Sequence, residues 1–198
     1  MTPTPKEETM TYRPTLAEYD FGEVASAIQK SIRRGLEEDA MFWSIVMEER
    51  FPWYLWKRLK VVAFEDCGSP EVIGHVMDCA RFYEEYRKER EKKGRGLKDE
   101  RLALASAILE MCRCKKNRLN DDFQAVLYHR YEKQGWRLEI PEYAVDKHTD
   151  RGRSKGKTEA DFLREGSMLA NEDTSVHNPY RAEWQKRVLA DSQTRLLP

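Results

Sequence analysis

The chain has 198 residues, of which 35% are charged and 40% hydrophobic, and its 35 lysines and arginines are balanced by 35 acidic residues. This composition is typical of a soluble helical protein, and the length allows one domain with appendages or at most two small domains. A net charge of zero excludes attraction to nucleic acid through the overall field, so any such affinity needs a local basic patch. The apolar runs are too short to cross a bilayer and no signal peptide opens the chain. We therefore expect a cytoplasmic protein without a membrane partner.

Residues 1–19 are rich in prolines, threonines and glutamates, and we expect a flexible N-terminal arm there. A helical domain over 20–135 follows. Its first helix begins at Asp20, which has capping-box spacing to Glu23, and ends at Gly35. The second helix follows at once. The residues predicted to be buried on these two helices are Val24, Ile28, Ile32, Leu36, Ala40, Trp43 and Met47.

Two further helices are predicted by their terminal residues. Pro52 suits the first turn of a third helix, because its missing N–H costs nothing there, and Gly68 is placed to close that helix in the left-handed conformation. Ser69, Pro70 and Glu71 then begin a fourth helix. The predicted apolar seams are Leu55, Leu59 and Val62 on the third helix, and Val72, Ile73, Val76, Met77 and Ala80 on the fourth.

The stretch 81–96 is highly charged and continues the fourth helix. Its glutamate–lysine and glutamate–arginine spacings predict a helix that protrudes into solvent, held partly by ion pairs and broken at Gly94 and Gly96. The alternative, an arm that binds nucleic acid, is disfavoured by its four glutamates. A fifth helix then begins at Lys98 or Asp99.

Lys115, Lys116 and Arg118 cluster at the end of the fifth helix. Cations there complement the helix dipole, which accounts for them without a ligand, although they are also candidate phosphate contacts. A sixth helix runs from about Asn120 to Gly135. The predicted inward-facing residues are Leu102, Ala105, Leu109 and Cys112 on the fifth helix, and Phe123, Val126, Leu127 and Tyr131 on the sixth.

Three blocks of this helical domain resemble a known family. They are ASAIQKSIRRG (25–35), DAMFWS (39–44) and WKRLKVVAFEDCGSP (56–70). With their spacing, they resemble the C-terminal domain of the MgsA/RarA/Werner-interacting family of clamp-loader-like AAA+ ATPases. A weaker likeness continues through 101–117. The resemblance implies an all-helical, collar-like domain that holds subunits together as a tetramer and does not itself hydrolyse ATP.

Five residues of these blocks are expected to have a structural role. They are Gln29, Lys30, Arg33, Glu65 and Asp66. The acidic pair is expected to close the third helix and to form ion pairs with Lys30 or Arg33, so its function is architectural rather than acid–base chemistry.

Four aromatic residues gather where the third helix begins. They are Phe51, Trp53, Tyr54 and Trp56. A helix with one apolar stripe buries only some of them, because consecutive positions point in different directions. Those left over predict an exposed apolar patch and an oligomer interface. The alternative is that the charged helix at 81–93, or a C-terminal helix around Trp184, covers them.

Residues 136–198 form an extension, in which 136–146 is expected to be extended but not a central strand. GRSKGKT (152–158) looks like a phosphate-binding loop, but it has three residues between its glycines where the Walker A loop needs four. ATP hydrolysis is therefore not expected. Arg151, Arg153, Lys155 and Lys157 alternate with small residues. They predict either a loop that binds nucleic acid or phosphate, or a solvated connector, and both interpretations stay open.

The sequence contains no convincing catalytic or metal site. Cys67, Cys79, Cys112 and Cys114 follow no disulfide framework, and Cys-x-Cys is not the spacing of a zinc knuckle, so we expect free thiols without a metal or cofactor. The histidines have no serine or cysteine in a nucleophile-elbow context. His148 with Asp150 alone is a weak signal for a metal or nuclease pair.

These observations together predict an all-α, non-enzymatic, oligomerising scaffold. The resemblance links it to DNA replication, recombination or repair, with further copies of the chain, a separate AAA+ ATPase or a replication protein as partners. The alternative is a nucleic-acid-binding module that acts on DNA through 151–157, with the helical part as its scaffold. An enzyme of unknown chemistry is the third and least supported hypothesis.

Overall fold

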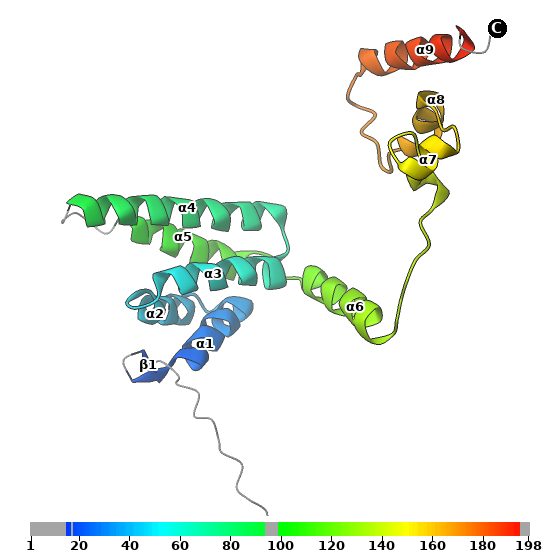
Figure 1. Cartoon of the computed structure of the whole chain (residues 1–198). Helices are drawn as coiled ribbons and strands as arrows, with labels where there is room; N and C mark the ends of the chain where they lie inside the picture. The colour runs from blue at the N-terminus through cyan, green and yellow to red at the C-terminus, as the bar shows by residue number, and fades with distance from the viewer. Residues whose placement is uncertain (1–14, 17, 94–98, 195–198) are drawn as a thin grey trace, which may run out of the picture. The chain divides into compact units, whose positions relative to one another are not determined.

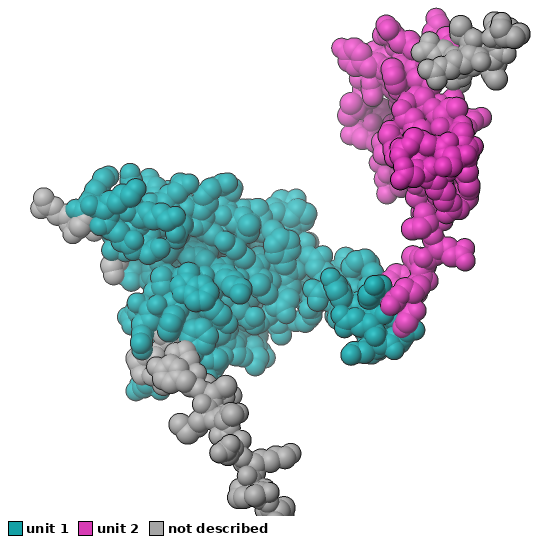
Figure 2. Space-filling view, viewed as in Figure 1, with its two compact units in different colours: residues 1–134 teal, residues 135–198 magenta. Residues whose placement is uncertain are grey.

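The computed structural model describes residues 15–16, 18–93 and 99–194. They form two compact units, residues 1–134 and residues 135–198 (Figures 1 and 2). The predicted all-α class is confirmed, because the described strands are a single two-residue pair and the other elements are helices. None of the described helices is long and apolar enough to span a bilayer.

The end of the predicted N-terminal arm is more ordered than expected. Strand β1 (Thr15–Leu16) pairs antiparallel with β2 (Tyr19–Asp20), which leads directly into the first helix. Residues 1–14 lie outside the described part of the chain.

Local capping chemistry fixes the first two helices where the sequence predicts them. Helix α1 (Phe21–Arg34) begins at Asp20, whose carboxylate accepts a hydrogen bond of 3.0 Å from the backbone N–H of Glu23. Gly35 ends α1 in the left-handed conformation, with φ of 72°. Helix α2 (Glu37–Glu48) starts two residues later, so the two helices fold back on each other.

The next helices contain one departure from regular geometry. Helix α3 (Pro52–Val62) has its proline in the first turn, as predicted, and it continues into η1 (Ala63–Cys67), a single π-helical turn. Gly68 closes that turn with φ of 68°. Helix α4 (Pro70–Lys93) then begins at the predicted proline and packs along α5 (Glu100–Arg113).

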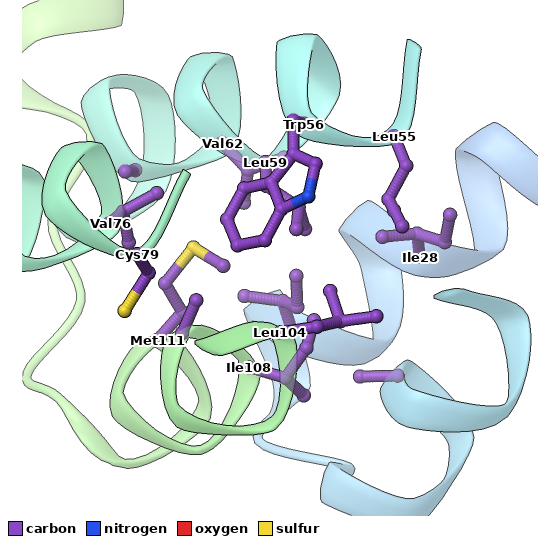
Figure 3. Close-up of a cluster of buried hydrophobic side chains, with 14 of the residues drawn as sticks. Ile28, Leu55, Trp56, Leu59, Val62, Val76, Cys79, Leu104, Ile108 and Met111 are labelled. Atoms are coloured by element: carbon purple, nitrogen blue, oxygen red, sulfur yellow. The ribbon is translucent and has the colours of Figure 1, made fainter. Parts of the chain in front are cut away.

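The core of the larger unit is built from side chains of all the helices from α1 to α5, and it contains most of the residues predicted to be buried. Figure 3 shows side chains from α1, α3, α4 and α5 meeting in one cluster, with the indole of Trp56 pointing into it. The labelled members are Ile28, Leu55, Trp56, Leu59, Val62, Val76, Cys79, Leu104, Ile108 and Met111, and all are buried.

Several predicted core positions are wrong or only partly right. Leu36, which precedes α2, and Met77 of α4 are both exposed. Trp43 is partly buried, because it packs edge-on against Tyr19 with ring centroids 5.1 Å apart, at the margin of the core. On α5 the predicted face is only partly right: Cys112 is buried, but Leu102 is 71% exposed and Leu109 is also exposed. The buried stripe is rotated, with Leu104, Ile108 and Met111 facing α1 and α4.

The charged half of α4 is less isolated than predicted. Glutamate–arginine and glutamate–lysine pairs do line it, for example Glu84 with Lys88 at 3.1 Å. However, Tyr83 is buried, and Arg90 donates a hydrogen bond of 2.7 Å to the buried carboxylate of Glu100 on α5. The helix is therefore docked by its charged half as well. The predicted breaks at Gly94 and Gly96, and a start at Lys98, lie outside the described residues.

Helix α6 (Leu119–Lys133) contradicts the prediction of an inward-facing side. None of its residues is buried, and Phe123, Val126 and Tyr131 are exposed. The reason is positional: the helix contacts the rest of its unit mainly at η1, and it extends away from the bundle beyond that point (Figure 1).

The smaller unit consists of several short elements and one longer helix. The segment predicted to be extended contains a 3-10 turn, η2 (Glu142–Ala144). Helices α7 (Asp150–Ser154) and α8 (Glu159–Asp161) follow, then a π turn, η3 (Phe162–Gly166), and helix α9 (Pro179–Thr194). Thr158 caps α8, and the side chain of Asn178 caps α9. Met168 is exposed beyond the end of η3.

Candidate functional site

The residues of the resemblance blocks converge on one buried carboxylate. Asp66 lies in η1 on the continuation of the buried α3 stripe, and its side chain is fully buried. Arg33 of α1 holds it with two hydrogen bonds of 2.9 and 3.1 Å, and Gln29 donates a third of 3.0 Å. Gln29 also donates to Glu65 at 2.7 Å. Four of the five predicted residues are thus brought together.

Arg118, which precedes α6, completes this cluster from a distant part of the sequence. Its guanidinium donates a hydrogen bond of 3.1 Å to Asp66 and also pairs with Asp121. We call Gln29, Arg33, Glu65, Asp66 and Arg118 the Asp66 network. It ties α1, η1 and the start of α6 together, which is an architectural role.

Lys30 is the predicted residue that the network leaves out. Its side chain is exposed on α1, and within the described part of the chain it forms no ion pair with the acidic residues of η1. The expected pairing of the acidic residues is therefore made by Arg33, one turn along from Gln29, where a helix brings a side chain to the same face.

The cation cluster at the end of α5 is largely occupied by intramolecular contacts. Lys116 donates to the terminal carbonyl oxygens of α5, at 3.1 Å to Cys112 and 3.3 Å to Cys114. Arg118 is held in the Asp66 network, which leaves Lys115 exposed. The observed contacts match the helix-dipole interpretation, in which cations cap the end of a helix.

The basic segment 151–157 is a short helix and turn rather than an open loop. Arg151 and Lys155 both bond to Glu142 at 3.0 Å, and Lys157 bonds to Glu165 at 3.1 Å. Arg153 pairs with Asp150. Each of the four cations therefore has a carboxylate partner, and the partners come from residues on either side of the basic segment.

The helix of this segment is fixed by a close backbone contact. A Cβ atom at Gly152 would lie 1.7 Å from the carbonyl oxygen of Asp146, so only glycine fits there. His148 pairs with the carboxylate of Asp146 at 2.9 Å rather than with Asp150. The first glycine of the loop-like motif thus serves packing.

Acid sensitivity is expected in this smaller unit. Hydrogen bonds from Thr158, in a capping box, lower the pKa of Asp161 to about 2. A lowered pKa adds stability above the ordinary value of 3.8, and that stability is lost as the pH falls from about 4 towards 2. Carboxyl chemical shifts followed by NMR should give a midpoint near pH 2 for Asp161. Thr158→Ala removes the hydroxyl but keeps the backbone N–H, which contributes most, so it should move the midpoint only part of the way towards 3.8; an unchanged midpoint would contradict the role of the side chain.

Three of the four cysteine thiols are buried in environments that suppress their reactivity. Burial raises the pKa of Cys67 to about 12 and that of Cys112 to about 11, so both stay protonated at neutral pH. His75 contacts Ser106 at 2.9 Å and Cys79 at 3.4 Å, a contact that the sequence did not predict. Burial also raises the pKa of Cys79, which makes its thiol a poor nucleophile. In the described residues, no three histidine, cysteine or acidic side chains gather as metal ligands.

The predicted aromatic patch divides into buried and exposed members. Trp56 is 5% exposed and lies in the core, while Phe51 and Tyr54 pack against Phe21. Only Trp53 fulfils the predicted exposure, at 67%. The prediction that only some of the four aromatic residues would be buried leaves Trp53 as the exposed one, while Phe51, Tyr54 and Trp56 pack against the protein.

Two of the exposed apolar surfaces in the described part of the larger unit follow a helical stripe. The first, which we call the α6 stripe, consists of Leu119, Phe123 and Val126 at helical spacing, and all three are exposed. The second, the α3 groove, is an open hollow of about 660 Å³ along the outer side of α3. The sequence places Phe123 and Val126 in the core and predicts neither Leu119 nor the groove.

Comparison with known proteins gives no family: no family model matches the chain, and no curated protein is significantly similar to it.

Proposed function

We propose that the chain is a non-enzymatic scaffold that associates with further copies of itself, and that the α6 stripe is the surface through which it does so. The resemblance to the MgsA/RarA collar domain adds the expectation of a tetramer working in DNA replication, recombination or repair, with a separate AAA+ ATPase or replication protein as an assembly partner.

The observation that carries this proposal is that α6 has an apolar stripe but no buried residue. Isolated helices of about 12–15 residues are marginal in water, and most helical stability comes from packing an apolar face. The start of α6 is anchored by the ion pair of Arg118 with Asp66. The side chain of Asn120 also donates a hydrogen bond of 3.1 Å to the backbone carbonyl oxygen of Phe64. A helix held at one end, with its apolar stripe uncovered, suits contact with another subunit.

The alternative of a nucleic-acid module acting through 151–157 has less support. Its four cations are already paired with carboxylates, so binding phosphate would require breaking those pairs. Breaking an exposed ion pair costs only about 0–1 kcal/mol. However, the carboxylates beside the four cations reduce the net positive charge that the segment offers to a phosphate backbone.

Self-association is tested with the double variant Leu119→Ser/Phe123→Ser. We expect the wild-type chain to sediment as an oligomer at tens of micromolar, a range typical of weak interfaces, and the double variant to dissociate at least about tenfold more readily. Both side chains are exposed, so the variant should keep its helical circular dichroism.

Leu102→Ser is the matched control, because Leu102 is equally exposed but lies on α5, away from the stripe. It should sediment like the wild type. A wild-type chain that stays monomeric up to tens of micromolar, or a double variant that associates like the wild type, would contradict the proposal.

A further inference from the structure

The α3 groove is an apolar surface that follows a single helical stripe. Trp53, Val61 and Phe64 recur at helical spacing on the outer side of α3 and the π turn, and all three are exposed. Met77 of α4 adds to its apolar lining, and Asn120 and Gln124 of α6 line it as well. Figure 1 shows the end of α3, the start of α4 and the start of α6 meeting at one end of the bundle.

The charge of the groove is positive once existing ion pairs are counted. Lys57 and Lys60 line it, and in the described part of the chain neither has an acidic partner. Of the acidic groups in the lining, Asp121 is paired with Arg118, whereas Glu65 keeps its charge because its hydrogen bond of 2.7 Å comes from the neutral amide of Gln29. The two lysines therefore outweigh the remaining carboxylate by one charge. Two ammonium groups beside an apolar stripe are complementary to a ligand that is apolar on one side and carries carboxylates next to it.

The α6 stripe of a second copy matches this chemistry only in part. Asp122 and Arg130 both lie beside the stripe, four positions before and four positions after Val126. A second α6 in the groove would therefore bring a guanidinium as well as a carboxylate towards Lys57 and Lys60. A helix that carries carboxylates alone beside its apolar side chains is more complementary to the two lysines.

We propose that the α3 groove binds an amphipathic helix of a partner protein, whose apolar side chains pack on Trp53, Val61 and Phe64 and whose carboxylates face Lys57 and Lys60. The stripe from Trp53 to Phe64 spans eleven steps of the helix, roughly 16 Å at 1.5 Å per residue, so the partner contributes about three turns. Laying one helix into a groove between others is a common mode of peptide recognition, with anchors at i, i+4 and i+7. This proposal stands independently of self-association.

The test uses two synthetic peptides of about 18 residues with the same leucine stripe. One carries glutamates beside the stripe and the other carries lysines at the same positions. Fluorescence anisotropy of the labelled peptides with the full chain should show that the acidic peptide binds at least about tenfold more tightly, with a Kd of roughly 10–100 μM.

Two variants of the chain separate the charge from the apolar contact. Lys57→Glu/Lys60→Glu should reverse the preference, so that the lysine peptide binds more tightly. Phe64→Ser should weaken both peptides at least about tenfold, since it removes an apolar anchor. Both variants change side chains that line the open groove, and circular dichroism with a thermal melt verifies that they fold.

Several outcomes would overturn the proposal: no binding of the acidic peptide up to about 1 mM, equal binding of the two peptides, or no response to the lysine substitutions. Sedimentation of the same variants distinguishes this failure from that of self-association. If Leu119→Ser/Phe123→Ser dissociates but still binds the acidic peptide, both proposals hold. If Phe64→Ser dissociates the oligomer while the acidic peptide does not bind, the groove is occupied by a second copy and the partner helix is rejected.

Discussion

Trp56→Ala is expected to lower the free energy of unfolding of the larger unit by about 3–5 kcal/mol, whereas Trp53→Ala should change it by less than about 0.5 kcal/mol. Trp56 is buried among α3, α4 and α5, with its ring centroid 5.2 Å from that of Tyr83 (Figure 3). Removing the indole leaves a cavity that the surrounding helices fill only in part. Urea unfolding followed by circular dichroism measures both variants.

Trp56→Phe is the matched control for this prediction. The indole N–H of Trp56 is buried and has no hydrogen-bond partner among the described residues. Replacing it with phenylalanine loses part of the packing but no hydrogen bond, so the cost should be clearly smaller than that of alanine. A Trp53→Ala variant that unfolds as readily as Trp56→Ala would contradict the exposure of Trp53 and the burial of Trp56.

Helix ends were predictable from the sequence because capping chemistry is local. Asp20, Gly35, Pro52 and Gly68 act within one turn of their own positions, so neighbouring residues contain the needed information. The all-α class followed from the same signals together with the helical spacing of apolar residues.

The choice of buried face was less predictable where a helix is apolar on more than one side. In α5, leucines and alanines occur all round the helix, and the helical spacing alone does not favour Leu104 and Ile108 over Leu102 and Leu109. Only the position of α1 and α4 decides between them. In α6 the helical spacing of apolar residues is present as predicted, but no other element of the described chain covers them. Helical spacing shows which side of a helix is apolar, and it does not show whether another element packs against that side.

The candidate sites depended on contacts over long sequence separations. The sequence predicts that Lys30 or Arg33 pairs with the acidic residues of η1, but Arg118 is 52 positions from Asp66 and nothing local indicates its contact. In the segment 151–157, three of the four cations pair with Glu142 or Glu165, which lie outside the basic segment. The α3 groove was not predicted at all, because it needs side chains from three helices.

Removing both arginines of the Asp66 network, as Arg33→Met/Arg118→Met, is expected to destabilise the larger unit by about 3–5 kcal/mol. Asp66 is fully buried, and its remaining hydrogen bond would be the one from Gln29. An uncompensated buried carboxylate is costly because the protein interior solvates charge far less well than water does. Arg81→Met is the control: it removes an exposed pair with Asp78 and should cost no more than about 1 kcal/mol.

A third substitution, Asp66→Asn, tests whether the loss of stability comes from burying an unpaired carboxylate. The test is the sign of its effect on the free energy of unfolding. In the wild-type background, Asp66→Asn should destabilise, because it removes the charge that Arg33 and Arg118 are arranged to meet. In the double-arginine background the same change should stabilise by about 1–3 kcal/mol, since a neutral amide is easier to bury than an unpaired carboxylate. The four free energies of unfolding form a double-mutant cycle. If Asp66→Asn destabilises both backgrounds equally, Asp66 is not the charge that holds α1, η1 and the start of α6 together.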